Sequence, residues 1–317
     1  MLYRPTADAD LDRVLACVVT EPVSWIPPDR HRRGLADRSH RPEWTWIAES
    51  GGRIVARAVW TGFPDAAHPY GLDCVWVDDE VTGPDRVGLA AELLAAAHRA
   101  LRAAGMRELP GYFLLLPDGW RDDPAVAAAL SWRREAAARA GLTEALRRLR
   151  YEWTPAAGVP EPTGRLAFRP EADDEAFLAA FIRVAEGSLD VTTRRNAAAV
   201  GAERQAREDM AVYRSLRGER SWWWLAHTPG GRLAGLAIPS RGDDGTATVG
   251  YLGVVPELRG NGYVDDLLAE ITRFHAAAGA PRIRALTDET NRPMAAAFER
   301  AGYRTVGSWL ILSEPPG

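Results

Sequence analysis

The stretch Tyr251-Leu-Gly-Val-Val-Pro-Glu-Leu-Arg-Gly-Asn-Gly-Tyr-Val-Asp-Asp-Leu-Leu-Ala-Glu270 decides how the rest of the chain is interpreted. Its first residues are apolar and partly β-branched, which predicts a buried strand. Pro256 ends that strand, because proline has no N–H to give to a sheet. From Val264 to Ile271 the apolar residues recur at helical spacing. The stretch therefore predicts a strand, a glycine-rich turn and a helix.

The turn has the sequence Arg259-Gly-Asn-Gly262. Gly260 and Gly262 have no Cβ, so the backbone can come close to a ligand. The N–H groups of such a turn lie at a helix N-terminus, where unpaired donors and the helix dipole favour an anion. The pattern predicts a phosphate-binding turn, although the same residues also occur in ordinary tight turns.

A second motif, Asn291-Arg-Pro-Met-Ala-Ala-Ala-Phe-Glu-Arg-Ala-Gly-Tyr303, follows an apolar run at 283–286. Its apolar residues form one stripe of a helix, and Gly302 stands where a helix C-cap belongs. Together, Val-x-Pro-x-x-Arg-Gly-x-Gly and Asn-x-x-Met-x-x-x-Phe-x-x-x-Gly-Tyr resemble the two signature motifs of the GNAT superfamily of N-acetyltransferases. The resemblance covers residues 166–312.

The resemblance implies that acetyl-CoA, the co-substrate, lies between two parallel strands that splay apart, here 249–255 and 283–286. Pantetheine would pair with backbone groups of the first strand, and one N–H would polarise the thioester carbonyl. The pyrophosphate would sit on the amides of the glycine turn. Asn291 would bind the cofactor or only cap its helix. The cofactor-binding residues implied are Val254, Val255, Arg259, Gly260, Asn261, Gly262, Tyr263, Val264, Asn291 and Phe298.

Proton transfer is the part of the chemistry that the family pattern does not supply here. An amine with a pKa near about 10 must lose a proton before it attacks. Some family members place a glutamate on the central strand for this step, and the matching position is Thr248. Many also have a tyrosine in the second motif's helix that protonates the leaving thiolate, where this chain has Phe298.

The candidate catalytic residues are therefore Glu186 and Asp190, in the region that lines the acceptor pocket of this family. They are four residues apart and could share one helix face. Alternatively, Gly187 and Ser188 break the helix and turn both carboxylates toward the pocket. Both residues also fit ordinary solvated carboxylates. Asp288, at the end of the second splayed strand, is a third candidate, although a capping role is simpler.

The chain contains a diverged repeat. Tyr3-Arg-Pro-Thr-Ala-Asp8 is echoed by Phe168-Arg-Pro-Glu-Ala-Asp173, and the two strands predicted at 44–56 are echoed at 222–235. The proline-rich stretch 154–165 separates the copies as a semi-rigid linker. The predicted domains are a degenerate GNAT-like lobe at 1–153, this linker, and an acetyl-CoA-binding lobe at 166–317.

The copies are not chemically equal. In place of the glycine turn, the first copy reads Val77-Asp-Asp-Glu-Val-Thr-Gly-Pro-Asp-Arg86, whose carboxylates would repel a pyrophosphate. We therefore expect one working lobe. The arginines between Arg133 and Arg150 fit a solvated helix face, and His275 is expected to be exposed.

Composition sets the remaining bounds. The 317 residues are 46% hydrophobic and 26% charged, which is typical of globular proteins. A net charge of −4 predicts neither nucleic acid nor membrane as a partner. The two cysteines, Cys17 and Cys74, form no metal framework and favour a reducing compartment. Without an apolar segment that suits a signal peptide, the cytoplasm is the expected location.

We interpret the chain as an α/β (α+β) protein with two tandem GNAT-like lobes. Each lobe is expected to have a mixed, mostly antiparallel sheet flanked by helices, with a splayed central strand pair. The predicted enzyme is an N-acetyltransferase that moves an acetyl or short acyl group from acyl-CoA to the amine of a small-molecule or peptide acceptor, by direct attack. The alternatives are an acetyltransferase like mycothiol synthase, a tandem family member of similar length, and a non-catalytic acyl-CoA sensor. A monomer or a homodimer is expected.

Overall fold

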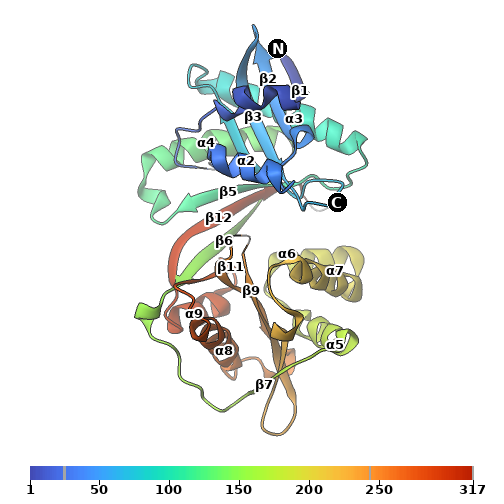
Figure 1. Ribbon diagram of the computed structural model, residues 1–317, viewed down its shortest axis with the longest axis vertical. Coiled ribbons are helices and arrows are strands. Elements are labelled where there is room, and N and C mark those ends of the chain that lie inside the picture. Colours follow the sequence, from blue (N-terminus) through green and yellow to red (C-terminus); the bar gives the residue numbers. More distant parts are fainter. Residues whose placement is uncertain (24–25, 243, 316–317) are drawn as a thin grey trace. The chain divides into compact units, whose positions relative to one another are not determined.

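A computed structural model describes residues 1–23, 26–242 and 244–315. The chain divides into two compact units, the first containing Met1–Arg147 and the stretch from Gly307 onward, the second containing Arg148–Val306 (Figure 1). The sequence-based division instead places 148–153 in the first lobe and all residues from 166 to 317 in the second. The divisions differ because strands β6 (Glu144–Trp153) and β12 (Arg304–Ser313) each contribute residues to both units.

The first unit is a six-element mixed sheet with helices packed on it. Its strand order is β1-β2-β3-β4-β5-β12, and only β4 and β5 run parallel. Helices α3 and α4 pack on each other, and α3 packs on the central strands. The bounds are β1 (Leu2–Pro5), α1 (Leu11–Leu15), α2 (Pro28–Ala36), β2 (Thr45–Ser50), β3 (Arg53–Thr61), β4 (Gly71–Val77), α3 (Gly83–Ala103), β5 (Gly111–Pro117) and α4 (Pro124–Arg139).

The second unit repeats this plan. Its strand order is β6-β11-β10-β9-β8-β7, and only β10 and β11 run parallel. The predicted mixed, mostly antiparallel sheet is confirmed in both units. The bounds are β7 (Ala167–Pro170), α5 (Asp174–Ala185), α6 (Val191–Val200), α7 (Ala202–Ser215), β8 (Trp224–His227), β9 (Leu233–Arg241), β10 (Ala247–Val254), α8 (Tyr263–Ala277), β11 (Ile283–Asp288) and α9 (Arg292–Arg300).

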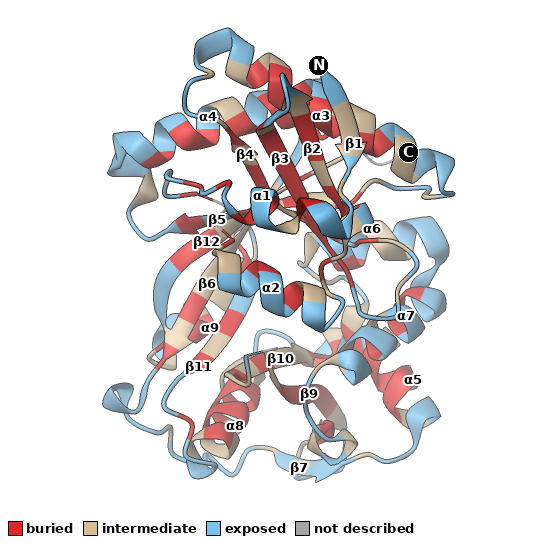
Figure 2. Ribbon diagram, turned by 45° about the horizontal axis from the view of Figure 1, so that its top comes forward, coloured by how far each residue is buried: buried red, intermediate tan, exposed pale blue. Residues whose placement is uncertain are grey.

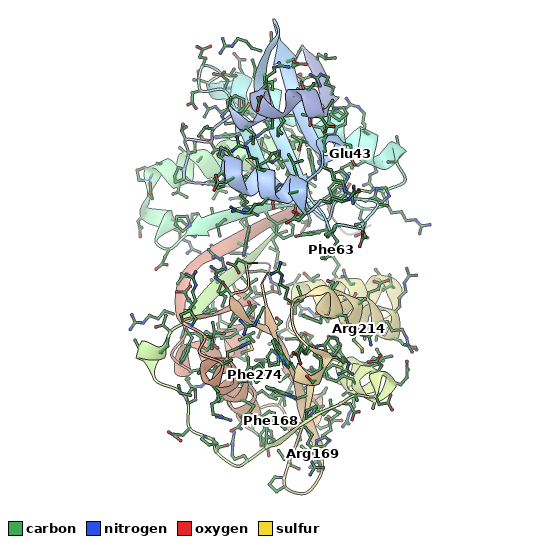
Figure 3. The ribbon with its side chains drawn as sticks, viewed as in Figure 1. Glu43, Phe63, Phe168, Arg169, Arg214 and Phe274 are labelled. Carbon is green, nitrogen blue, oxygen red and sulfur yellow. The ribbon has the colours of Figure 1, made fainter. Side chains whose placement is uncertain are left out.

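Helix α8 is held on the sheet by its apolar face, as its sequence pattern predicts. Leu267, Leu268 and Ile271 are fully buried, and each such side chain stabilises the fold by roughly 1.5–3 kcal/mol. Figure 2 shows much of α8 in the colour of buried residues. At the far end of the helix lies Phe274, which Figure 3 labels. Its ring packs against that of Trp224, with centroids 5.1 Å apart. This packing fixes the N-terminus of α8 beside the end of β10.

The central strands of the second unit separate, as expected. β10 and β11 are paired only at Ala247–Ile283 and Thr248–Arg284. Just beyond this pairing, a bulge at Gly250 interrupts the register between β10 and β9. A Cβ at Gly250 would lie 2.6 Å from the Oγ of Ser240, so only glycine fits there. The bulge bends β10, and beyond it β10 has no strand partner on its β11 side in the described part of the chain.

The hydrogen bonds of β10 show which backbone groups face this gap. Val255 donates its N–H to the carbonyl oxygen of Ala234 in β9, at 2.9 Å. Backbone groups of successive strand residues point to opposite edges. The N–H and C=O of Val254 and of Leu252 therefore point toward the β11 side.

The first unit contains the same separation of its two parallel strands. β4 and β5 are paired only at Gly71–Gly111 and Leu72–Tyr112, and the register of β4 with β3 shifts at Asp73. Asp78 donates its N–H to Val55 just as Val255 donates to Ala234. Two copies of one splayed α/β unit are therefore present, which confirms the predicted tandem fold.

The expectation that His275 is exposed was wrong. Its ring is fully buried, and Nε2 lies 3.1 Å from the carbonyl oxygen of Thr248. The last turns of α8 pack against Trp222, so the His275 ring contacts the rings of Trp222 and of its chain neighbour Phe274. Burial lowers the pKa of His275 to about 4.

This lowered pKa predicts a pH-dependent loss of stability. His275 stays neutral in the folded protein below pH 6.5, whereas in the unfolded chain it takes up a proton. Stability is therefore lost as the pH falls from 6.5 toward 4, by about 2 kcal/mol at pH 5. The difference in urea midpoint between pH 7 and pH 5 should be smaller in His275→Gln than in the wild type. If the difference in urea midpoint were the same in both proteins, His275 would not be the source of this pH dependence.

Candidate functional site

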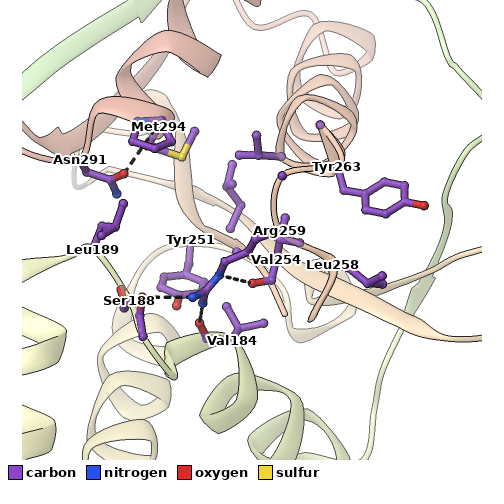
Figure 4. A pocket seen from close by; sticks show the side chains of 17 residues that line it. Val184, Ser188, Leu189, Tyr251, Val254, Leu258, Arg259, Tyr263, Asn291 and Met294 are labelled. Atoms are coloured by element: carbon purple, nitrogen blue, oxygen red, sulfur yellow. Dashed lines mark hydrogen bonds between the residues drawn. The ribbon is translucent and has the colours of Figure 1, made fainter. Parts of the chain in front are cut away.

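A cavity of about 340 Å³ lies in the second unit where β10 leaves β11 (Figure 4). Its walls are the end of α5 and the loop after it, the free edge of β10, the glycine turn, and the start of α9. The lining is mostly apolar side chains and backbone. It consists of Val184, Gly187, Ser188, Leu189, Tyr251, Leu252, Gly253, Val254, Leu258, Arg259, Gly260, Gly262, Tyr263, Val264, Asn291, Pro293 and Met294.

The backbone of the glycine turn is held in a fixed orientation. Gly260 and Gly262 have φ values of 80° and 74°, which L side chains rarely adopt, and Gly262 is the N-cap of α8. The side-chain amide of Asn261 donates to the carbonyl oxygens of Leu258 and Arg259, at 3.0 and 3.3 Å. Because C=O and N–H of one trans peptide point in opposite directions, the N–H of Gly260 faces away from the Asn261 side chain.

The N–H groups of the turn form the anion-binding feature of the cavity. Among the described residues, none accepts a hydrogen bond from the N–H of Gly260, Gly262 or Val264. These donors lie at the start of a long helix, where the dipole adds a partial positive charge. Such a row of amides suits a phosphate group.

The position of Arg259 in the motif suggests a ligand contact, but its side chain binds backbone carbonyl groups of the protein itself. Its guanidinium donates to the carbonyl oxygens of Val184, Glu186 and Gly187, at 2.7–3.0 Å, and its Nε donates to Val254 (Figure 4). It therefore caps the C-terminal carbonyls of α5 and ties them to the end of β10. The side chain of Arg259 therefore stabilises the cavity wall, and only the backbone of this residue belongs to the turn.

The structure brings together most of the predicted cofactor-binding residues. Val254, Arg259, Gly260, Gly262, Tyr263, Val264 and Asn291 line the cavity, whereas Val255, Asn261 and Phe298 do not. The N–H of Val255 is used within the sheet, and Asn261 holds the turn. Phe298 is buried and stacks on Tyr151 at 4.9 Å. Asn291 caps α9 through the N–H of Met294 and also reaches the cavity.

The two predicted catalytic carboxylates are on different elements. Helix α5 ends at Ala185, so Gly187 and Ser188 do break the helix, and Asp190 is the N-cap of α6. Glu186 is exposed, and its carboxylate has no hydrogen bond or ion pair with any residue in the described ranges. Neither side chain belongs to the cavity lining.

Asp190 is part of a charged cluster behind the cavity. One of its oxygens accepts the N–H of Thr193 at 2.8 Å, and the other pairs with Arg148 at 2.7 Å. Arg148 also lies 2.9 Å from the buried Asp288, which accepts the N–H of Val191. Burial, with the nearby Asp190, raises the pKa of Asp288. The cluster fixes the start of α6 on the end of β11.

Tyr251 lines the cavity but is not among the predicted cofactor-binding or catalytic residues. Its ring stacks on Phe181 at 4.6 Å and lies 5.5 Å from the ring of Tyr213. Burial raises the pKa of Tyr251, so the hydroxyl stays protonated and can donate a hydrogen bond. Its position two residues before the pocket-lining Gly253, on the same face of β10, was the available signal.

The gap in the first unit is filled by the chain's own side chains. Arg133 is 1% exposed, and its guanidinium donates to the carbonyl oxygen of Val75 on the free edge of β4, at 3.3 Å. The same guanidinium pairs with Glu21 at 2.6 Å. Glu21 also accepts from Trp132 and Arg86. The expectation of a solvated face was therefore wrong for Arg133, which takes the backbone carbonyl that a ligand would need.

Fold and cavity together define an α/β unit that can hold a phosphate-bearing ligand along a free strand edge. Residues 165–304 match the family model described as "Acetyltransferase (GNAT) domain". The second unit of the chain is therefore similar to the GNAT acetyltransferase domain over most of its length.

Individual proteins show further similarity to the chain. An acetyltransferase of Yersinia enterocolitica is 26% identical over 103 residues, which are 32% of this chain and 72% of that protein. A GCN5-related N-acetyltransferase from Sphaerobacter thermophilus has a similar fold, with a TM-score of 0.63 and 16% identity over 99% of this chain and 95% of that one. A tandem GNAT protein from the clavulanic acid biosynthesis pathway has a TM-score of 0.54 and 20% identity, over 100% and 98%. The last two show the fold alone.

Within the described ranges, none of the helices combines the length and the apolar character that crossing a bilayer requires.

Proposed function

We propose that the second unit binds acetyl-CoA, or another short acyl-CoA, and transfers the acyl group to the amine of a small-molecule or peptide acceptor. The observation that carries this proposal is the coincidence of a free strand edge, a row of unpaired turn amides and one cavity that connects them. In this arrangement the pyrophosphate would lie on the glycine turn and the pantetheine would lie along β10.

The chemistry is a direct attack. The amine nitrogen forms a bond to the thioester carbonyl carbon, the C–S bond breaks, and the CoA thiolate leaves and takes a proton. Val254 and Leu252 direct N–H groups toward the gap, and one of them can stabilise the negative charge that develops on the carbonyl oxygen. The carbonyl of Val254 already accepts from Arg259, which holds the end of β10 in place. Positioning of this kind supplies much of the rate enhancement in such reactions.

The amine must lose a proton, and we propose Glu186 and Asp190 as the acceptors of that proton. Glu186 is favoured, because its carboxylate is not engaged by any described residue, whereas both oxygens of Asp190 are already bound. The loop that carries them continues into Gly187, Ser188 and Leu189, which line the cavity.

A second function, a non-catalytic acyl-CoA sensor, is favoured by two observations. Thr248 stands where a family glutamate is common, and its hydroxyl bonds to the carbonyl of Thr246 at 3.1 Å. Phe298 has no ionisable group and is buried in the core. Neither residue can move a proton for the reaction.

Release of free CoA separates the two functions. The protein is incubated with acetyl-CoA and a panel of small-molecule and peptide amines, and free thiol is measured against a reaction without acceptor. We expect thiol release that depends on at least one amine. Calorimetric binding of acetyl-CoA without turnover on any amine would instead support the sensor.

The glycine turn yields a direct prediction. Gly262→Asp places a carboxylate where the pyrophosphate is expected and should weaken CoA binding at least tenfold, about 1.4 kcal/mol. Gly279→Asp is the matched control, because Gly279 lies at the other end of α8 with the same φ of +74° and has open space around it. Both variants carry the same backbone strain, so calorimetry with both isolates the ligand effect. Equal affinity in the two variants would mean that the turn binds no phosphate.

A further inference from the structure

The segment that precedes β7 lies on the glycine turn. Arg165 donates from Nη1 to the carbonyl oxygen of Asn261 at 3.1 Å, and Nη2 pairs with Asp266 in the first turns of α8. Its guanidinium lies over the ring of Tyr263, 5.1 Å from the centroid. Thr163 of the same segment donates to Asp266 at 2.6 Å. This part of the predicted linker is therefore docked on the turn.

We propose that Arg165 is a positioning residue for the pyrophosphate of the acyl-CoA, which makes the linker segment a part of the cofactor site. The inference rests on the proposed function and adds to it a residue outside both sequence motifs. Three features of the structure support it.

The first feature is the peptide between Asn261 and Gly262. Arg165 holds its carbonyl oxygen, so the N–H of Gly262 must point away from Arg165. Gly262 lines the cavity and its N–H has no acceptor among the described residues. Arg165 thus fixes the direction of a donor that the pyrophosphate would use.

The second feature is charge. Asp265 and Asp266 lie in the first turns of α8, and both would repel a phosphate at the helix N-terminus. Arg300 pairs with Asp265 at 2.7 Å, and Arg165 pairs with Asp266, whose side chain is only 4% exposed. A buried carboxylate is screened little by solvent, so its neutralisation by Arg165 matters most.

The third feature is proximity to the cavity lining. The guanidinium of Arg165 lies over the ring of Tyr263, which lines the cavity. A Cβ built at Gly262, another lining residue, would lie 3.4 Å from Nη2. Arg165 therefore supports the turn on the side opposite to the N–H of Gly262.

The test compares Arg165→Gln with the wild type by calorimetry, using CoA, dephospho-CoA and pantetheine as probes. Dephospho-CoA lacks the 3′-phosphate but keeps the pyrophosphate, and pantetheine lacks both. We expect at least a tenfold loss of affinity for CoA and for dephospho-CoA, and an unchanged affinity for pantetheine.

The matched control is Arg273→Gln. Arg273 also joins the linker to α8, because it donates to the carbonyl of Pro160 at 3.3 Å and pairs with Glu270, but it lies beyond the turn. This variant should bind all three probes like the wild type. An equal loss of CoA affinity in both variants would mean that Arg165 only attaches the linker to α8 and has no specific role at the pyrophosphate.

Three other results would overturn the proposal: unchanged affinity for CoA in Arg165→Gln, a loss confined to CoA, which assigns Arg165 to the 3′-phosphate, or an equal loss for pantetheine, which indicates a distorted cavity. Failure of the wild type to bind CoA and dephospho-CoA would refute the proposed function itself and is thereby distinguished from these.

Discussion

Arg133→Ala is expected to destabilise the first unit by about 3 kcal/mol. The guanidinium is 1% exposed and is the partner of both Glu21 and the carbonyl of Val75. Its removal leaves that carbonyl buried without a donor and opens a cavity over β4. The loss falls at the lower end of the range for breaking a buried pair, because Glu21 is 24% exposed and keeps Arg86 and Trp132.

Urea unfolding measures this effect, with Arg134→Ala as the control. Arg134 is the next residue of α4 and is exposed, so its loss should change stability by less than about 0.5 kcal/mol. Arg133→Met keeps most of the volume and should recover part of the loss. Equal midpoints for Arg133→Ala and Arg134→Ala would show that the filled gap contributes nothing to stability.

Glu186→Gln is expected to lower kcat by roughly 10²–10⁴-fold, with CoA affinity unchanged, once an acceptor amine has been found. The substitution keeps the size of the side chain and removes its charge. Glu257→Gln is the control, because Glu257 is a nearby exposed carboxylate that pairs with Arg183 and is outside the cavity lining. It should leave kcat unchanged.

Asp190→Asn tests the other candidate in the same assay. If Asp190 holds a cationic acceptor, KM rises while kcat stays nearly constant. If it takes the proton, kcat falls instead. Because Asp190 caps α6 and pairs with Arg148, the stability of the Asp190→Asn variant must also be measured. Loss of the cap alone is expected to lower the free energy of unfolding by about 1 kcal/mol. Wild-type kcat and KM in both variants would exclude both carboxylates from the reaction.

The sequence predicted the local parts of the site well. The strand before Pro256, the glycine turn and α8 are contiguous in the chain, so spacing and residue type are enough to define them. The separation of β10 from β11 followed from the resemblance to a family. The bulge at Gly250 that accompanies it is not visible as a motif, because the need for glycine there comes from the close approach of Ser240 on β9.

Contacts between distant segments were not predictable from local patterns. Arg133 resembles its exposed neighbours in sequence, and only the return of Glu21 and the open edge of β4 explain its burial. Arg165 belongs to a stretch that composition identifies as a linker, and it acts through Asn261 and Asp266, about a hundred residues later in the chain. The arginines between Arg133 and Arg150 were expected on one solvated helix face, but the last of them, Arg148 and Arg150, lie in strand β6, which pairs with β11.

The number of CoA molecules bound per chain tests the central claim most directly. The account assigns one site to the second unit and closes the equivalent gap of the first unit with Arg133. Calorimetry of the full chain with CoA should therefore give a stoichiometry of about one, and in Gly262→Asp that single event should weaken or disappear. Two equivalent sites, or one site that Gly262→Asp leaves at full affinity, would contradict the account.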